Sequence, residues 1–248
     1  MRSLGSILKA AVIAGLIAGA AAAGFHALLI EPVIDRAIEL EEHRSQARGE
    51  VAQEPLIDRP TQRWGLLVGF LLYGAIWGLL FGMLSHSMQA WQPSAWTADR
   101  RRFLLALLVG WSVAVFPFLK YPANPPGIGE LETISYRQGL YFGFIGLSVA
   151  GSAFAVGLHR FLHRPAQSSA MEWVRWPLAL VFYVVYATAV YVIMPANPDP
   201  VEMPAQLVWT FRAISFGGLV LFWGALGGVF AWLSRERAFA LVRRRTTW

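Results

Sequence analysis

GLLVGFLLYGAIWGLLFGML, residues 65–84, contains no Asp, Glu, Lys or Arg. A helix needs about 20 apolar residues to cross the roughly 30 Å hydrocarbon core of a bilayer, so this stretch is typical of a transmembrane helix. The shortest run of the same kind, residues 103–119, needs the flanking Lys120 or Arg102 to reach the interface. The remaining runs are residues 10–30, 139–158, 176–194 and 213–233.

The composition agrees with these runs. Of the 248 residues, 56% are hydrophobic and only 15% are charged, and the mean hydropathy is +0.48. Such a chain is too apolar to be a soluble globular protein. We therefore predict an all-α membrane protein with six transmembrane helices, folded as a single transmembrane domain over residues 1–248.

Several function classes are excluded by the sequence. Cysteine is absent, so neither a disulfide framework nor a thiolate metal site is available. The chain also has no nucleotide-binding loop, nucleophile elbow, zinc-protease motif or dinucleotide fingerprint. We predict that it is not an enzyme, holds no permanently bound cofactor and binds no nucleic acid.

Charge is divided unequally between the segments outside the helices. The N-terminus, the second and fourth loops and the C-terminal tail carry 13 of the 21 basic residues and only 3 of the 15 acidic ones. The other loops carry 8 basic and 12 acidic residues. Because cytoplasmic loops accumulate Lys and Arg, both termini are predicted to be cytoplasmic, and this also explains the net charge of +6.

A second interpretation applies to the first 25 residues, which could be a cleaved signal peptide. Arg2 and Lys9 precede an apolar run that ends in the small-residue stretch "AGAAAAG". The apolar run continues to Ile30, which is long for a signal peptide. Cleavage would leave the topology of the remaining helices unchanged.

The helices pair into hairpins that resemble one another, over residues 4–85, 102–160 and 174–234. Proline follows the first helix of each pair and should end it, because it lacks an N–H and excludes helical geometry before it. An ordinary helix end explains these prolines alone, but not the arginine that recurs at the start of each second helix. We therefore predict three pseudo-repeated hairpins. The recurring residues are Pro32, Pro122 and Pro195, and Arg63, Arg137 and Arg212.

Three hairpins around one axis would place their helix ends in a ring at the outer face. Carboxyl ends of helices present partly negative carbonyls, and oxygen ligands suit a hard or borderline cation. The mouth would include Pro125 beside the recurring prolines and arginines. The arginines oppose the helix dipole and need either lipid headgroups or acids such as Asp58, Glu130, Glu132 and Glu202. The predicted metal ligands are His26, Glu31, Asp35, Asn124 and Asn197.

His26 also has a simpler explanation as a hydrogen-bonded core histidine. The acidic outer loop, residues 31–63, contains "EPVIDRAIELEEHRSQAR", which is typical of an amphipathic helix on or near the membrane surface. Its carboxylates either form a solvated charged face or concentrate cations at the mouth.

Small residues recur at a spacing of one helical turn, which allows transmembrane helices to pack closely. We therefore expect a compact bundle. The pairs and series are Gly15 with Gly19, Gly65 with Gly69, Gly74 with Gly78 and Gly82, Gly139 with Gly143, and Gly224 with Gly228.

The stretches "EPVIDRAIELEE", "YPANPPG" with "SYRQGLYFG", and "PANPDP" with "WTFR" resemble the CbtA family of predicted cobalt transporter subunits over nearly the whole chain. The resemblance implies a multi-pass protein of the bacterial or archaeal inner membrane that supplies cobalt for corrin cofactors. It also implies a small single-span CbtB partner with a histidine-bearing tail. Family descriptions usually count five spans, against six here. The family pattern covers Glu31, Pro32, Pro122, Ala123, Asn124, Pro125, Arg137, Pro195, Asn197 and Arg212.

Two functions are compatible with the sequence. The first is the membrane subunit of a Co²⁺ or other divalent-cation uptake transporter, with the cation collected by the acidic loop and the PAN-P turns. The second is a non-transporting scaffold or assembly protein that binds membrane lipid or a partner subunit, or forms a homo-oligomer. The sequence leaves open the ion, the direction of transport, its energy source and the oligomeric state.

Overall fold

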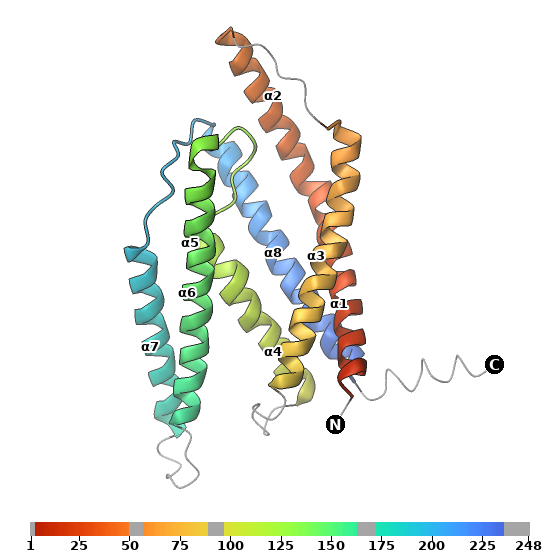
Figure 1. Cartoon of the computed structure of the whole chain (residues 1–248), viewed down its shortest axis with the longest axis vertical. Helices are drawn as coiled ribbons and strands as arrows, with labels where there is room; N and C mark the ends of the chain where they lie inside the picture. The colour runs from red at the N-terminus through yellow and green to blue at the C-terminus, as the bar shows by residue number, and fades with distance from the viewer. Residues whose placement is uncertain (1–2, 50–56, 89–96, 163–171, 236–248) are drawn as a thin grey trace, which may run out of the picture. The chain divides into compact units, whose positions relative to one another are not determined.

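The computed structural model describes residues 3–49, 57–88, 97–162 and 172–235. Six helical segments in this part of the chain are long and apolar enough to cross a membrane, which confirms the six expected spans. The elements are α1 (Leu4–Phe25), η1 (His26–Ile30), α2 (Glu31–Ala47), α3 (Arg59–Ser87), α4 (Ala98–Gly110), η3 (Trp111–Val115), α5 (Phe116–Lys120), η4 (Leu131–Thr133), α6 (Ile134–Phe161), α7 (Glu172–Ile193) and α8 (Ala205–Leu233). Figure 1 traces their order along the chain.

The helices form two compact units. Unit 1 contains α1, η1, α2, α3, α4 and α8, together with the short segment 124–127. Unit 2 contains η3, α5, η4, α6 and α7. The predicted hairpins 102–160 and 174–234 therefore each contribute helices to both units. The threefold repeat and the single domain stay predictions.

Glycine packing joins α1 to α3 at the centre of unit 1. A Cβ atom on Gly15 would lie 2.0 Å from the carbonyl oxygen of Gly74, and one on Gly74 would lie 2.1 Å from that of Gly15. Gly19 faces the carbonyl of Phe70, with 2.3 Å to the oxygen from an added Cβ. The two backbones are in direct contact, as expected for transmembrane helices that meet at small residues.

Other glycine pairs do not pack in this way. Among the residues that the structure describes, nothing lies within 4 Å of a Cβ atom built on Gly65, Gly69, Gly139, Gly143, Gly224 or Gly228. The expectation of close helix contacts at these positions is wrong, because spacing along a helix does not specify which face meets a neighbour.

Unit 2 is built around α6 and α7, which pack side by side (Figure 1). Its core contains Phe116, Phe144 and Ala187. The indole N–H of Trp111 donates a hydrogen bond to the hydroxyl of Tyr183, which links η3 to α7. Between residues 176 and 193 of α7 most large side chains are exposed, as expected for a surface that contacts lipid.

Two helices contain a π-helical turn followed by a proline. η1 precedes Pro32 and η3 precedes Pro117, and each proline is the second residue of the next α segment. Proline in a helix lacks an N–H donor and its ring crowds the carbonyl four residues earlier, and the wider π turn relieves this conflict. The helix therefore continues through Pro32, and the expected helix end there is wrong. The expected ends before Pro122 and Pro195 are confirmed, since α5 ends at Lys120 and α7 at Ile193.

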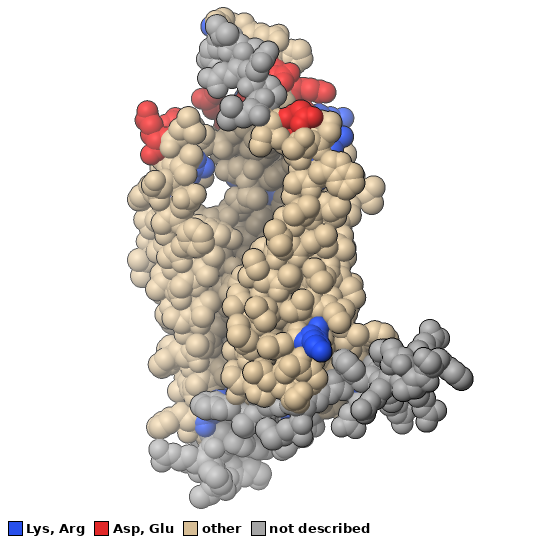
Figure 2. All heavy atoms as spheres, turned by 45° about the vertical axis from the view of Figure 1, so that its right-hand side comes forward, with Lys and Arg blue, Asp and Glu red and all other residues tan. Residues whose placement is uncertain are grey.

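The predicted acidic loop 31–63 is largely helical. α2 continues α1 beyond the π turn as one helical segment, Leu4–Ala47, of 44 residues (Figure 1). At about 1.5 Å per residue this is roughly twice the thickness of the hydrocarbon core, so α2 extends out of the membrane. Ala37 is fully buried on its inner side, as expected for an amphipathic helix. Figure 2 shows acidic side chains around α2 in this unit and, below them, a broad surface with few charged side chains.

Candidate functional site

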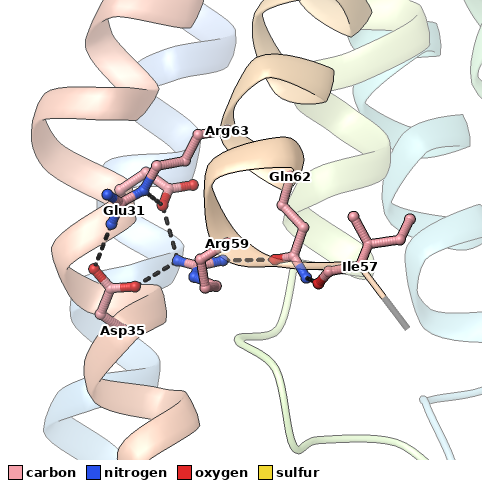
Figure 3. A network of polar contacts seen from close by, with 6 residues as sticks. All are labelled: Glu31, Asp35, Ile57, Arg59, Gln62 and Arg63. Atoms are coloured by element: carbon pink, nitrogen blue, oxygen red, sulfur yellow. Dashed lines mark hydrogen bonds and ion pairs between the residues drawn. The ribbon is translucent and has the colours of Figure 1, made fainter. Parts of the chain in front are cut away.

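Two carboxylates of α2 meet two guanidinium groups of α3 where these helices face each other (Figure 3). Arg59 Nη2 lies 2.9 Å from Glu31 Oε2 and 2.5 Å from Asp35 Oδ1. Arg63 Nε lies 3.2 Å from Glu31 Oε2, and its Nη2 lies 3.0 Å from Asp35 Oδ2. We call these residues the four-charge cluster.

The sequence spacing explains the geometry of this cluster. Glu31 and Asp35 are four residues apart on α2, as are Arg59 and Arg63 on α3, so each pair occupies one helix face. Gln62 orients Arg59, because its Oε1 accepts a hydrogen bond from Arg59 Nη1 at 2.8 Å. The cluster has no net charge, and its most buried member is the Glu31 carboxylate, which is 10% exposed.

His26 stands one π turn before Glu31. The N–H of Glu31 donates to the carbonyl of His26, as the π geometry requires. The imidazole ring packs on Phe70 with 5.3 Å between ring centroids, and its Nδ1 atom is buried without a hydrogen-bond partner among the described residues. The Nδ1 atom of His26 is therefore available to a ligand, as a lone pair or as an N–H. His26 belongs to the same unit as the four-charge cluster and is close to Glu31 in sequence.

Residues 124–127 of the first PAN-P turn belong to unit 1 and contact α8. Arg212 Nη2 donates to Asn124 Oδ1 at 2.7 Å. Gly127, at a positive φ of 80°, lies beside Met203 and the carboxylate of Glu41, where a Cβ atom would approach Met203 Cε to 2.6 Å. A glycine is needed here both for the backbone conformation and for the close approach.

The second PAN-P turn holds a buried carboxylate that sequence reasoning missed. The side chain of Asp199 is 1% exposed and lies 2.9 Å from Arg137 Nε. It also accepts hydrogen bonds from the Thr133 hydroxyl at 2.7 Å and from the Glu130 N–H at 3.3 Å. Asn197 Oδ1 accepts the N–H of Asp199 at 3.1 Å, which shapes the turn itself. This arrangement lies entirely within unit 2.

All the recurring arginines therefore have polar partners within their own unit. Arg63 pairs with Glu31 and Asp35, Arg137 with Asp199, and Arg212 with an amide. Acids do compensate Arg63 and Arg137, but they are not the ones expected from sequence. Glu130 contributes its backbone carbonyl, 2.9 Å from Arg137 Nη2, rather than its carboxylate.

The predicted metal ligands are distributed over several environments. Glu31 and Asp35 lie together and His26 precedes them, whereas Asn124 is bound to Arg212 and Asn197 belongs to unit 2. Among the described residues, no group of three or more His, Cys, Asp or Glu side chains is arranged to hold a metal ion. A metal role for these five residues stays a prediction. Within this set, Glu31 and Asp35 lie in one cluster, and His26 precedes Glu31 by one π turn in the same unit.

The sequence contained signals for the missed residues. Arg59 precedes Arg63 by four residues, which matches the spacing of Glu31 and Asp35 and could have paired the two helices. Asp199 distinguishes "PANPDP" from "PANPPG", where Pro126 stands at the same place. That difference marks a turn whose carboxylate can accept hydrogen bonds from a nearby cation.

Comparison with known protein families gives a match over most of the chain. The sequence model of the family described as "Probable cobalt transporter subunit (CbtA)" matches residues 4–235. No curated protein and no solved structure matches the chain.

Proposed function

The chain belongs to the CbtA family of probable cobalt transporter subunits, and on this premise we propose that it collects Co²⁺ for uptake at the four-charge cluster. The observation that carries this proposal is the pair of carboxylates, Glu31 and Asp35, on one face of α2 at the end of a membrane-spanning helix. Carboxylate oxygens and a neighbouring imidazole are suitable ligands for a borderline divalent ion.

Electrostatics supports entry at this end. The charge distribution predicts that the loop containing α2 lies outside the cytoplasm. Exposed carboxylates on α2, Glu39, Glu41 and Glu42, create a negative potential that raises the local cation concentration. Uptake is therefore the direction that this arrangement favours.

Binding requires an exchange of partners. In the structure Arg59 and Arg63 occupy the carboxylate oxygens that a cation would need. We propose that Co²⁺ displaces the guanidinium groups, gains Glu31 and Asp35 as ligands, and reaches His26 by way of the π turn between them. The arginines then act as competitors that keep the site closed when no cation is present and limit how tightly the ion is held.

Membership of the family also supports a proposal for the membrane, the cobalt-requiring process and the partner subunit. The chain would lie in the inner membrane of a bacterium or archaeon, supply cobalt for corrin synthesis and work with a small single-span subunit of the CbtB type. No catalytic step is assigned to any residue, in keeping with a transporter subunit. A threefold arrangement of hairpins around one axis remains part of the proposal.

A scaffold function is the second candidate. It is favoured by the scarcity of polar ligands, since the described residues contain no cluster of three or more metal-binding side chains. It is also favoured by the largely exposed apolar surface of α7, which could contact lipid or another subunit.

Accumulation of radioactive cobalt in cells that lack their own uptake system separates the two functions. Cells that express the chain should accumulate Co²⁺ several-fold above the vector control, and the double variant Glu31→Gln, Asp35→Asn should return uptake close to that control. Glu42→Gln is the matched control, because it removes an exposed carboxylate from the same helix outside the cluster and should retain most uptake. Uptake by the parent chain at the vector level, with normal amounts in the membrane, would contradict transport and favour the scaffold.

A further inference from the structure

A buried hydroxyl at the middle of α6 has no hydrogen-bond partner in the described part of the chain. Ser148 is 0% exposed, and its Oγ atom contacts no donor or acceptor among the described residues. Buried polar atoms are nearly always paired, so an orphaned one needs an explanation such as an unseen ion or water. At the centre of a membrane-spanning helix, lipid and bulk water supply no alternative partner.

The contacts of Ser152 and Phe144, one helical turn to either side of Ser148, indicate which segment Ser148 faces. One turn along α6, Ser152 Oγ lies 2.7 Å from Ser112 Oγ, in the π turn η3. One turn in the other direction, the Phe144 ring packs on Phe116 with 5.0 Å between centroids. The segment 112–116 therefore runs antiparallel to 144–152, and Ser148 lies opposite the middle of the π turn.

The backbone of this segment is also irregular. Pro117, the second residue after the π turn, has no N–H, so residue 117 donates no hydrogen bond to the carbonyl of Val113, four residues earlier. Irregular backbone at membrane depth is tolerated where it is buried in protein or lines a cavity, and in transporters it often coordinates ions. Ser112 and Ala114 in this turn are both buried.

From this arrangement we propose that unit 2 binds a hard monovalent cation, Na⁺, between η3 and α6. Its ligands are the hydroxyls of Ser148, Ser112 and Ser152 and a backbone carbonyl of the π turn. Neutral hydroxyl and carbonyl oxygens suit Na⁺, whereas divalent ions select carboxylate or imidazole ligands, which these positions lack. The inference rests on the proposed uptake function in one respect: there, Na⁺ would serve as the ion whose gradient drives Co²⁺ entry.

The test measures ²²Na⁺ binding to the purified full chain in detergent, without cobalt. The parent chain should bind ²²Na⁺ saturably, with displacement by unlabelled Na⁺ and not by choline. Ser148→Ala should weaken binding at least tenfold, whereas Ser148→Thr, which keeps the hydroxyl, should retain it. Ser85→Ala is the matched control, because Ser85 is an equally buried serine in unit 1 and should leave binding unchanged.

Thermal unfolding in Na⁺ and in choline verifies that the variants fold and gives a second measurement. Na⁺ should raise the unfolding temperature of the parent chain and of Ser85→Ala, but not that of Ser148→Ala. Absence of saturable ²²Na⁺ binding to folded parent chain, or equal binding by Ser148→Ala, would overturn the proposal and leave the hydroxyl to a water molecule. Because cobalt is not used, this failure would not affect the uptake proposal, and failed cobalt uptake would not affect Na⁺ binding.

Discussion

Asp199→Ala is expected to destabilise unit 2 by about 3–5 kcal/mol, the range seen when one partner of a buried ion pair is removed. The Asp199 carboxylate is almost fully buried and accepts three interactions, from Arg137, Thr133 and the Glu130 N–H. Alanine would remove this acceptor from all three donors, one of which is a partly buried cation. Thermal or denaturant unfolding in detergent measures the loss.

A double-mutant cycle separates the ion pair from general damage to the turn. Arg137→Leu combined with Asp199→Ala should cost less than the sum of the single changes, because Arg137→Leu removes the cation that Asp199→Ala leaves unpaired. Strict additivity of the two changes, or a single change that costs less than about 1 kcal/mol, would show that the pair does not hold the PANPDP turn to α6.

Gly74→Ala is expected to destabilise unit 1 by about 1–3 kcal/mol, or to prevent its folding, through overpacking between α1 and α3. The added methyl group would lie 2.1 Å from the Gly15 carbonyl oxygen and 3.2 Å from Gly19 Cα, and neither of these backbone atoms can move aside as a flexible side chain can. The yield of monodisperse protein and its unfolding temperature provide the measurement.

Gly69→Ala on the same helix is the matched control and should have the opposite sign. No atom of the described part of the chain lies within 4 Å of a Cβ atom there, and alanine is favoured over glycine in a helix by about 0.5–1 kcal/mol. Equal stability losses for the two variants would contradict direct backbone contact between α1 and α3.

The apolar segments could be predicted from sequence because hydropathy and length are local properties. The run at residues 65–84 required a helix wherever its neighbours lay, and the structure contains it within α3. The ends of α5 and α7 were also predictable, because two closely spaced prolines follow each of them. These features depend on the covalent chain and on the bilayer, and not on tertiary contacts.

The misplaced features depend on contacts between helices. A single proline usually ends a helix, and only the π turn before Pro32 allows α2 to continue α1. The glycine pair at Gly65 and Gly69 has the same spacing as Gly15 and Gly19, yet only the second faces a neighbour. The pairing of Asp199 could not be predicted, because its partner Arg137 lies 62 residues earlier in the chain and no local pattern joins them.

Co²⁺ binding to the purified full chain, measured by titration calorimetry, tests the proposed exchange at the four-charge cluster most directly. Arg63→Gln removes one competitor for Glu31 and Asp35, so it should tighten Co²⁺ binding, by about tenfold if it contributes ~1.4 kcal/mol. Glu31→Gln should weaken binding below that of the parent chain. An affinity order of Arg63→Gln, then parent, then Glu31→Gln is the predicted result, whereas no Co²⁺ binding by the parent chain, or the same affinity in all three proteins, would contradict it.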